Sequence, residues 1–165
     1  MFYQLNFINY KNNIQKINIV DMKDCFSYDQ NIQLFTGENA MFCSSCQKTC
    51  PSLYCTKIYS GPTILVIVLN RGKGVEFNVK LNFTEDLDLM DFIECKQLGY
   101  KYKLIGVVTH MGESGAGGHF IAFCKNPIDN NWYKYNDEFV SKVNNFQKEI
   151  IDYARPYILF YRKAQ

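Results

Sequence analysis

Hydrophobic and polar residues alternate along most of this chain in short runs that are typical of β-strands. The strongest run is the β-branched stretch 63–69, TILVIVL, which follows a Gly-Pro breaker and predicts a strand covered on both faces. Residues 72–83 alternate more regularly and predict a half-buried strand, which can pair with 63–69 through a glycine-rich bend.

Turn residues separate four further β-rich runs in the C-terminal half. These runs are residues 100–110, 117–126, 131–137 and 155–163, with one amphipathic segment, 141–153, before the last of them. The order predicts a β-rich α+β fold with a mostly antiparallel sheet and few short helices.

The N-terminal region is less regular. Residues 2–20 form two alternating stretches around a polar turn at residues 11–13, a pattern that resembles a hairpin. Asp21 is a suitable N-cap, so we expect a short helix after it and then an extended piece up to Phe35.

Composition narrows the class of protein. The 165 residues fit one domain or the larger part of one, and 47% apolar residues exclude a disordered chain. A net charge of +2 without a long run of one sign leads us to expect no nucleic-acid partner. No apolar run could span a membrane, and the seven cysteines are not spread like a disulfide framework, so we expect a soluble protein of the cytoplasm and/or nucleus.

One histidine stands in a setting that suggests catalysis. The stretch SGAGGHFIAFCKN places His119 after a glycine-rich turn and at the head of an apolar strand. Seventeen positions later, Asn136 and Asp137 end a strand that can pair antiparallel with that of His119. A cysteine nucleophile requires a histidine that an Asn or Asp side chain holds in one tautomer, so this pattern is half of a thiol protease site.

The second histidine, His110, is the competing candidate. It ends a predicted strand before a turn, and it has no orienting residue at a suitable spacing. We expect a partly exposed histidine that closes the strand.

Several segments together resemble a known family. FCSSC, GPTILVIVLNR, YKLIGVVTHMGESGAGGHFIAFCK, WYKYNDEFVSKV and PYILFYRK are similar to the C-terminal half of the catalytic domain of ubiquitin-specific proteases, the papain-like deubiquitinases, over roughly residues 35–163. The resemblance implies that residues 1–165 form the palm and part of the fingers, without the nucleophile-bearing part. It also implies that His119 is the general base, that Asn136 orients it, and that Asp137 shares that task or supports a polar contact.

The resemblance also implies a partner, ubiquitin or a ubiquitinated protein. Gly117, Gly118 and Phe120 match the family positions that border a narrow channel for the ubiquitin tail, where close backbone approach favours glycine. Phe120 replaces the usual tyrosine, LNRGKG stands where Leu-Lys-Arg-Phe is usual, and the family's Asn-x-Gly-Asn-x-Cys nucleophile box is missing.

None of the cysteines has the context of a nucleophile. We expect Cys25, Cys95 and Cys124 to be buried structural thiols, with Cys124 on the face of its strand opposite His119. The chain alone is therefore expected to be inactive. A non-catalytic ubiquitin-binding or scaffold module of the same fold is the alternative, and an ordinary papain-type peptide protease matches the motifs less well.

The remaining cysteines form a cluster, CSSCQKTCPSLYC. Cys43 and Cys46 have the C-x-x-C spacing of a zinc knuckle, and Cys50 and Cys55 could supply two more thiolates, although not as a second C-x-x-C. Catalysis requires no cofactor. A structural zinc is one interpretation of the cluster, and a half-site that is empty or partly oxidised is the one we favour.

Overall fold

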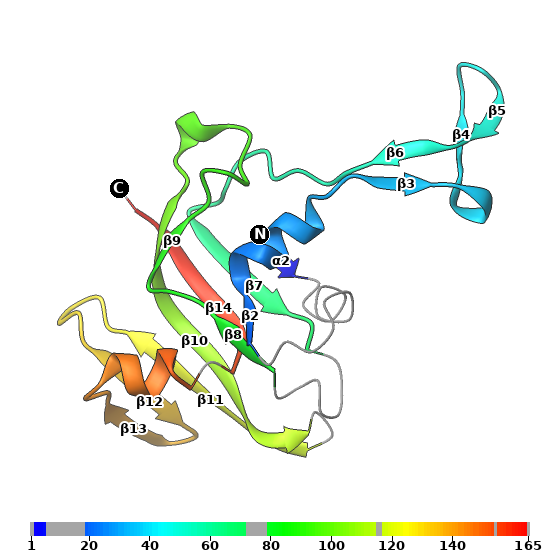
Figure 1. Cartoon of the computed structure of the whole chain (residues 1–165). Coiled ribbons are helices and arrows are strands. Elements are labelled where there is room, and N and C mark those ends of the chain that lie inside the picture. The colour runs from blue at the N-terminus through cyan, green and yellow to red at the C-terminus, as the bar shows by residue number, and fades with distance from the viewer. Residues whose placement is uncertain (1, 6–18, 72–78, 115–116, 154, 165) are drawn as a thin grey trace.

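A central mixed sheet organises the fold in a computed structural model, which describes the chain except residues 1, 6–18, 72–78, 115–116, 154 and 165. The strands follow the order β1, β7, β14, β10, β11, β12, β13, with β9 paired to β10 (Figure 1). Their bounds are β1 (Phe2–Leu5), β7 (Ile64–Leu69), β9 (Asp86–Asp88), β10 (Lys101–Ser114), β11 (Gly117–Lys125), β12 (Trp132–Asn136), β13 (Phe139–Lys142) and β14 (Pro156–Lys163). The four predicted C-terminal strands are confirmed as β10, β11, β12 and β14.

The hydrophobic core lies against the middle of this sheet. Leu65, Ile67 and Leu69 of β7 are 4%, 0% and 0% exposed, and they belong to one buried cluster with Leu104 and Leu159. Burying each such side chain contributes about 1.5–3 kcal/mol. The alternate side chains of β7 are only half-buried, so the strand is confirmed but its predicted full cover on both faces is wrong.

Neither of the two predicted hairpin pairings is found among the residues that the structure describes. β1 pairs in parallel with β7, whereas β2 (Ile19–Asp21) pairs in parallel with β8 (Lys80–Asn82) in a separate two-stranded sheet. β1 and β2 therefore do not pair with each other, and β8 does not pair with β7; residues 6–18, which include the predicted turn, and residues 72–78 lie outside the described residues. Alternation shows that a strand forms, but parallel partners are set by long connections that it does not reveal.

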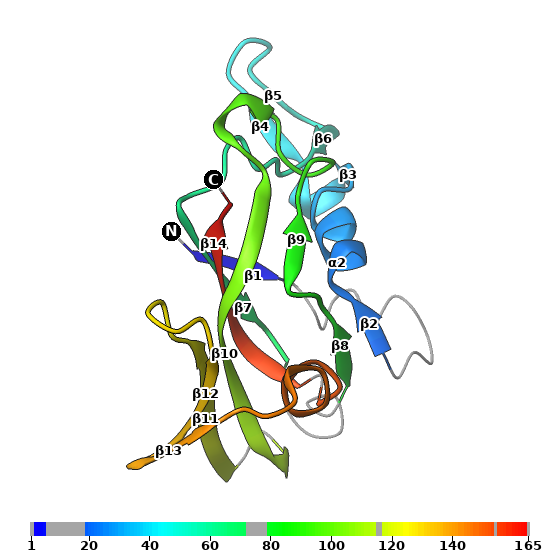
Figure 2. The same cartoon turned by 90° about the vertical axis from the view of Figure 1, so that its left-hand side faces the viewer.

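The helix predicted after Asp21 is confirmed as α2 (Met22–Asp29). Asp21 Oδ1 accepts a hydrogen bond from the backbone N–H of Lys23 at 2.8 Å, which caps the first turn. The buried Phe26 ring contacts the ring of Tyr3 at 5.2 Å and that of Phe92 at 5.4 Å. Together with β2 and β8, α2 lies on one side of the central sheet (Figure 2).

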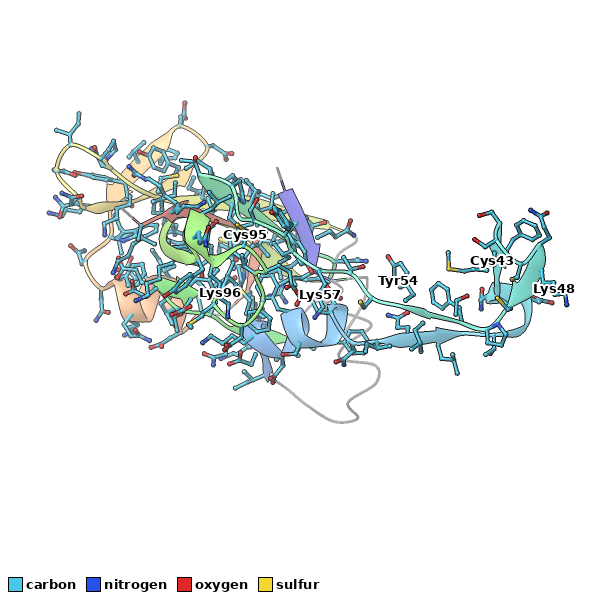
Figure 3. The ribbon with its side chains drawn as sticks, turned by 90° about the horizontal axis from the view of Figure 1, so that it is seen from above. Cys43, Lys48, Tyr54, Lys57, Cys95 and Lys96 are labelled. Atoms are coloured by element: carbon cyan, nitrogen blue, oxygen red, sulfur yellow. The ribbon has the colours of Figure 1, made fainter. Side chains whose placement is uncertain are left out.

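Two small hairpins project from the body, and we call them the finger hairpins (Figure 1). One pairs β3 (Gln33–Phe35) with β6 (Ser52–Tyr54), and the other pairs β4 (Met41–Cys43) with β5 (Lys48–Cys50). A view from above shows Cys43 at their far end, well away from Cys95 on the body (Figure 3).

Short helical turns complete the described structure. They are η1 (Gly37–Asn39), η3 (Lys96–Leu98) and the π-type turn η4 (Gln147–Ile151). The amphipathic segment 141–153 thus begins within β13 and continues through η4. In the described part of the chain, no helix has the length and apolar character needed to cross a bilayer.

Candidate active site

Antiparallel pairing brings His119 and Asn136 onto one face of the sheet. β11 pairs with β12, and Ala122 lies opposite Tyr135. Because successive side chains of a strand alternate between faces, Asn136 points away from the face of Tyr135 and towards the face of His119. Both residues lie close to the ends of their strands, where side chains remain accessible.

The two side chains are in contact. His119 Nε2 lies 2.5 Å from Asn136 Oδ1. An amide oxygen can only accept, so Nε2 carries the hydrogen and donates it. Nδ1 is then the basic atom of the neutral ring, and with 44% of the side chain exposed the ring is open to solvent. This arrangement prepares the imidazole to accept a proton at Nδ1.

Asp137 is a second, weaker partner of the same imidazole. Its Oδ2 atom lies 3.5 Å from His119 Nε2, and its side chain is 75% exposed. Solvent screens such a pair, which limits its contribution to about 0–1 kcal/mol. Asp137 begins the two-residue turn between β12 and β13 with a φ of 51°, a conformation that aspartate tolerates better than most residues.

The two glycines before His119 differ in whether a residue with a side chain would fit in their place. Gly118 has a φ of 152°, and a Cβ there would overlap the His110 ring and lie 2.6 Å from the carbonyl oxygen of Met111. Only glycine fits that position. Gly117 is exposed and a Cβ there would meet nothing within 4 Å, so no described neighbour demands glycine.

Phe120 lies on the face of β11 opposite His119, because the two residues are adjacent in one strand. Its ring is 51% exposed and makes edge contacts with His110 at 4.8 Å and with Tyr157 at 5.4 Å between centroids. Of the three residues predicted to bind substrate, the structure places Gly117 and Gly118 directly before His119, and Phe120 on the reverse face.

The position of His110 differs from the expectation of a partly exposed histidine at the end of a strand. It lies within β10 and not at the end of a strand, and it is only 6% exposed. Phe120 faces it across the strand pair, and the Tyr153 hydroxyl donates to its carbonyl oxygen at 3.5 Å. A partly exposed histidine was expected because the pattern of one strand does not show what neighbouring elements cover.

The predicted structural thiols divide into different environments. Cys25 is buried as expected, and burial, followed by the charge of Asp29, raises the pKa of its thiol to about 12. Cys95 is half-buried, and Cys124 is exposed, so the prediction that Cys124 is buried is wrong. Cys124 does lie on the opposite face of β11 from His119, as expected.

Comparison with known proteins then identifies the family. A family model described as "Ubiquitin carboxyl-terminal hydrolase" matches residues 11–161. The chain belongs to the ubiquitin carboxyl-terminal hydrolase family. Rat ubiquitin carboxyl-terminal hydrolase 48 is 32% identical over 129 residues, and the chicken protein of the same name is 33% identical over 129 residues. Each alignment covers 74% of this chain and 12% of the relative.

Solved structures agree with this assignment. A SAGA DUB module with Ubp8, Sgf11, Sus1 and Sgf73 bound to monoubiquitin has a TM-score of 0.68 and 25% identity, covering 89% of this chain and 35% of that one. A related module bound to ubiquitin aldehyde has a TM-score of 0.67 and 25% identity, with the same coverage. The chain therefore has the fold of the hydrolase family but spans about an eighth of the curated relatives it matches.

Sequence reasoning missed two tyrosines near the site of this hydrolase-family chain. Tyr157 contacts Phe120, and Tyr153 reaches the backbone of His110 from the segment that follows η4. Both lie in runs where apolar and aromatic residues fit an ordinary strand or helix, so no signal in the sequence distinguished them.

The C-x-x-C pair, Cys43 and Cys46, lies at the tip of the finger hairpin formed by β4 and β5. The backbone N–H of Cys46 donates to the Cys43 thiol and lowers its pKa, which favours the thiolate that a metal needs. Among the described residues, however, no group of three or more His, Cys, Asp and Glu side chains could hold a metal ion. Cys43 and Cys46 by themselves would supply two of the four ligands that a structural zinc requires.

Proposed function

We propose that this chain forms the base-bearing part of a thiol-dependent deubiquitinase, which hydrolyses the peptide or isopeptide bond after the C-terminal glycine of ubiquitin. The contact between His119 and Asn136 is the observation that carries the proposal. The family assignment supports it, as do two structural neighbours described as bound to monoubiquitin and to ubiquitin aldehyde.

His119 is the general base of the proposed reaction. Its Nδ1 atom takes the proton of a cysteine thiol, and the thiolate attacks the carbonyl carbon of the ubiquitin glycine. The imidazolium then returns the proton to the leaving amine, and a water molecule, deprotonated by the same ring, hydrolyses the acyl-enzyme. Asn136 Oδ1 holds the Nε2–H throughout, and Asp137 adds a screened charge when the ring is protonated.

The nucleophile is expected from sequence beyond these 165 residues. Cys25 is excluded by burial and by its raised pKa, and Cys124 faces away from the imidazole. No metal takes part in the proposed catalysis. The seven thiols that the structure describes are all free, which supports a reducing location such as the cytoplasm or nucleus.

Substrate binding is proposed for Gly117 and Gly118. Both are exposed directly before His119, and without side chains they let an extended Gly-Gly tail approach the backbone closely. Phe120, on the reverse face, is proposed to border the same channel from the side of His110.

The decisive experiment measures release of a fluorophore from a ubiquitin C-terminal conjugate. In a longer form of the protein that includes the nucleophile, His119→Ala should reduce kcat/KM by about a thousandfold, and Asn136→Ala by a smaller factor, because a ring without its acceptor still adopts the productive orientation part of the time. Asn31→Ala, an exposed asparagine remote from the site, is the matched control and should leave the rate unchanged.

The isolated 165-residue chain should show no turnover in the same assay. Turnover that is abolished by changing one of its own cysteines would show that the nucleophile is within it. Ubiquitin binding by a longer form that has no hydrolase activity would instead favour a non-catalytic ubiquitin-binding or scaffold module.

A further inference from the structure

His110 is nearly fully buried directly behind the proposed catalytic residue. Its ring lies on the face of the β10–β11 pair opposite the His119 imidazole, since His110 pairs with Phe120 and Met111 with His119. The proposed reaction gives His110 no role, although it is one of only two histidines in the chain.

The His110 ring occupies the space that a side chain at Gly118 would need. A Cβ on Gly118 would overlap this ring, and one on Gly112 would lie 3.0 Å from its Cε1 atom. The ring therefore packs against the backbone of both strands just before His119. It is itself held by the edge of the Phe120 ring at 4.8 Å, which in turn contacts Tyr157.

This packing has a geometric consequence for the site. Gly118 precedes His119 directly, so the backbone of Gly118 sets the origin and direction of the His119 side chain. With a φ of 152°, that backbone lies outside the conformations that residues with side chains prefer, and glycine lacks a side chain to anchor it. The buried ring of His110, packed against the Gly118 backbone, restricts the movement of that backbone.

We propose that His110 is a positioning residue, whose buried ring fixes the Gly118 backbone so that His119 meets Asn136 with its Nε2–H. The inference rests on the proposed function, because the alignment of His119 matters for catalysis only if His119 is the general base. The planar shape of the ring, and not its protonation, is the property that acts. Removal of the ring frees Gly118 to move, and His119 then loses the alignment that selects one tautomer.

The histidine tautomers of the 165-residue chain test this proposal directly. The chain has two histidines, so long-range proton–nitrogen NMR spectra at alkaline pH, where imidazole is neutral, contain two ring patterns. In the unaltered chain His119 should carry its hydrogen on Nε2 alone. His110→Ala should convert the His119 pattern into a mixture of both tautomers, and His110→Phe, which keeps a planar ring, should restore the single tautomer.

Three further variants show how large a change in the His119 tautomer to expect and provide a control. Asn136→Ala removes the hydrogen-bond acceptor and should give the largest tautomer mixing. Gly118→Ala should disturb His119 as well, because the new methyl group would meet both the His110 ring and the carbonyl oxygen of Met111. Val107→Ala removes packing at a residue of the same strand that is 3% exposed, and it should leave the His119 tautomer unchanged.

The outcomes separate the two proposals. An unchanged His119 tautomer in folded His110→Ala, or mixing in His110→Phe equal to that in His110→Ala, would overturn the positioning role. If His110→Ala does not fold, His110→Phe decides the question: a single His119 tautomer supports the role of the planar ring, and a mixture of tautomers overturns it. If Asn136→Ala also leaves the tautomer unchanged, the failure lies with the His119–Asn136 pair and hence with the proposed function.

Discussion

At the scale of single residues, the environment of each thiol decides its chemistry more than its residue type does. Cys25 lies in α2, where helical context could lower a pKa, but burial and three aspartates, Asp29 foremost, raise it. Cys43 lies at a hairpin turn, where backbone and thiol hydrogen bonds from Cys46 lower its pKa. The same side chain is thus harder to ionise in one place and easier to ionise in the other.

Alkylation should follow this difference. In a pH series with iodoacetamide, and with a chelator present to keep metal away, labelling of Cys43 should set in at a lower pH than labelling of free N-acetylcysteine, because the pKa of the Cys43 thiol is lowered. Cys25 should stay unmodified until the pH approaches about 12 or the chain unfolds. Peptide mapping by mass spectrometry measures both. Rapid labelling of Cys25 in the folded chain would contradict its burial.

At the scale of elements, one buried arginine joins two segments far apart in the sequence. Arg71 is 2% exposed; its Nε–H donates to the carbonyl oxygen of Pro156 at 2.5 Å, and its Nη1 donates to that of Val79 at 2.5 Å. Burial, and then the nearby Arg155, lower the pKa of its guanidinium to about 10, which still leaves it charged at neutral pH. The guanidinium links the start of β14 to Val79, the residue directly before β8.

Substitution of Arg71 should separate these elements. Arg71→Ala leaves two buried carbonyl groups without a donor and should lower the free energy of unfolding by about 2–4 kcal/mol. Arg71→Lys should recover only part of this loss, because an ammonium group cannot reproduce the fork of the guanidinium. Urea denaturation measures both, with Arg162→Ala, exposed on β14, as the control. Equal stability of Arg71→Ala and Arg162→Ala would show that the two hydrogen bonds contribute little.

At the scale of the whole molecule, the body and the finger hairpins are stabilised differently. The core residues belong to the body, whereas the finger hairpins extend away from it and expose apolar side chains such as Leu34, Phe42 and Leu53 at 63%, 62% and 73%. The hairpins are therefore held mainly by their own pairing, and the body does not depend on them.

Shortening the projection should leave the body intact. Replacement of residues 36–51 by Asn-Gly joins β3 directly to β6 through a two-residue turn. The free energy of unfolding should change by less than about 1 kcal/mol, and the amide signals of β10 and β11 should keep their positions. Loss of cooperative unfolding, followed by circular dichroism, would show that the projection contributes to the core.

The sequence by itself determined the strands β7, β10, β11, β12 and β14, the helix cap at Asp21 and the pairing of His119 with Asn136. Each of these follows from local alternation, from a capping residue or from two strands joined by a short turn, so nearby residues suffice to specify it. Only the tertiary structure decided that β1 and β2 enter separate parallel pairs, that His110 is buried and that Cys124 is exposed. These features depend on which distant segments cover a surface, and the periodicity of a single strand carries no information about its neighbours.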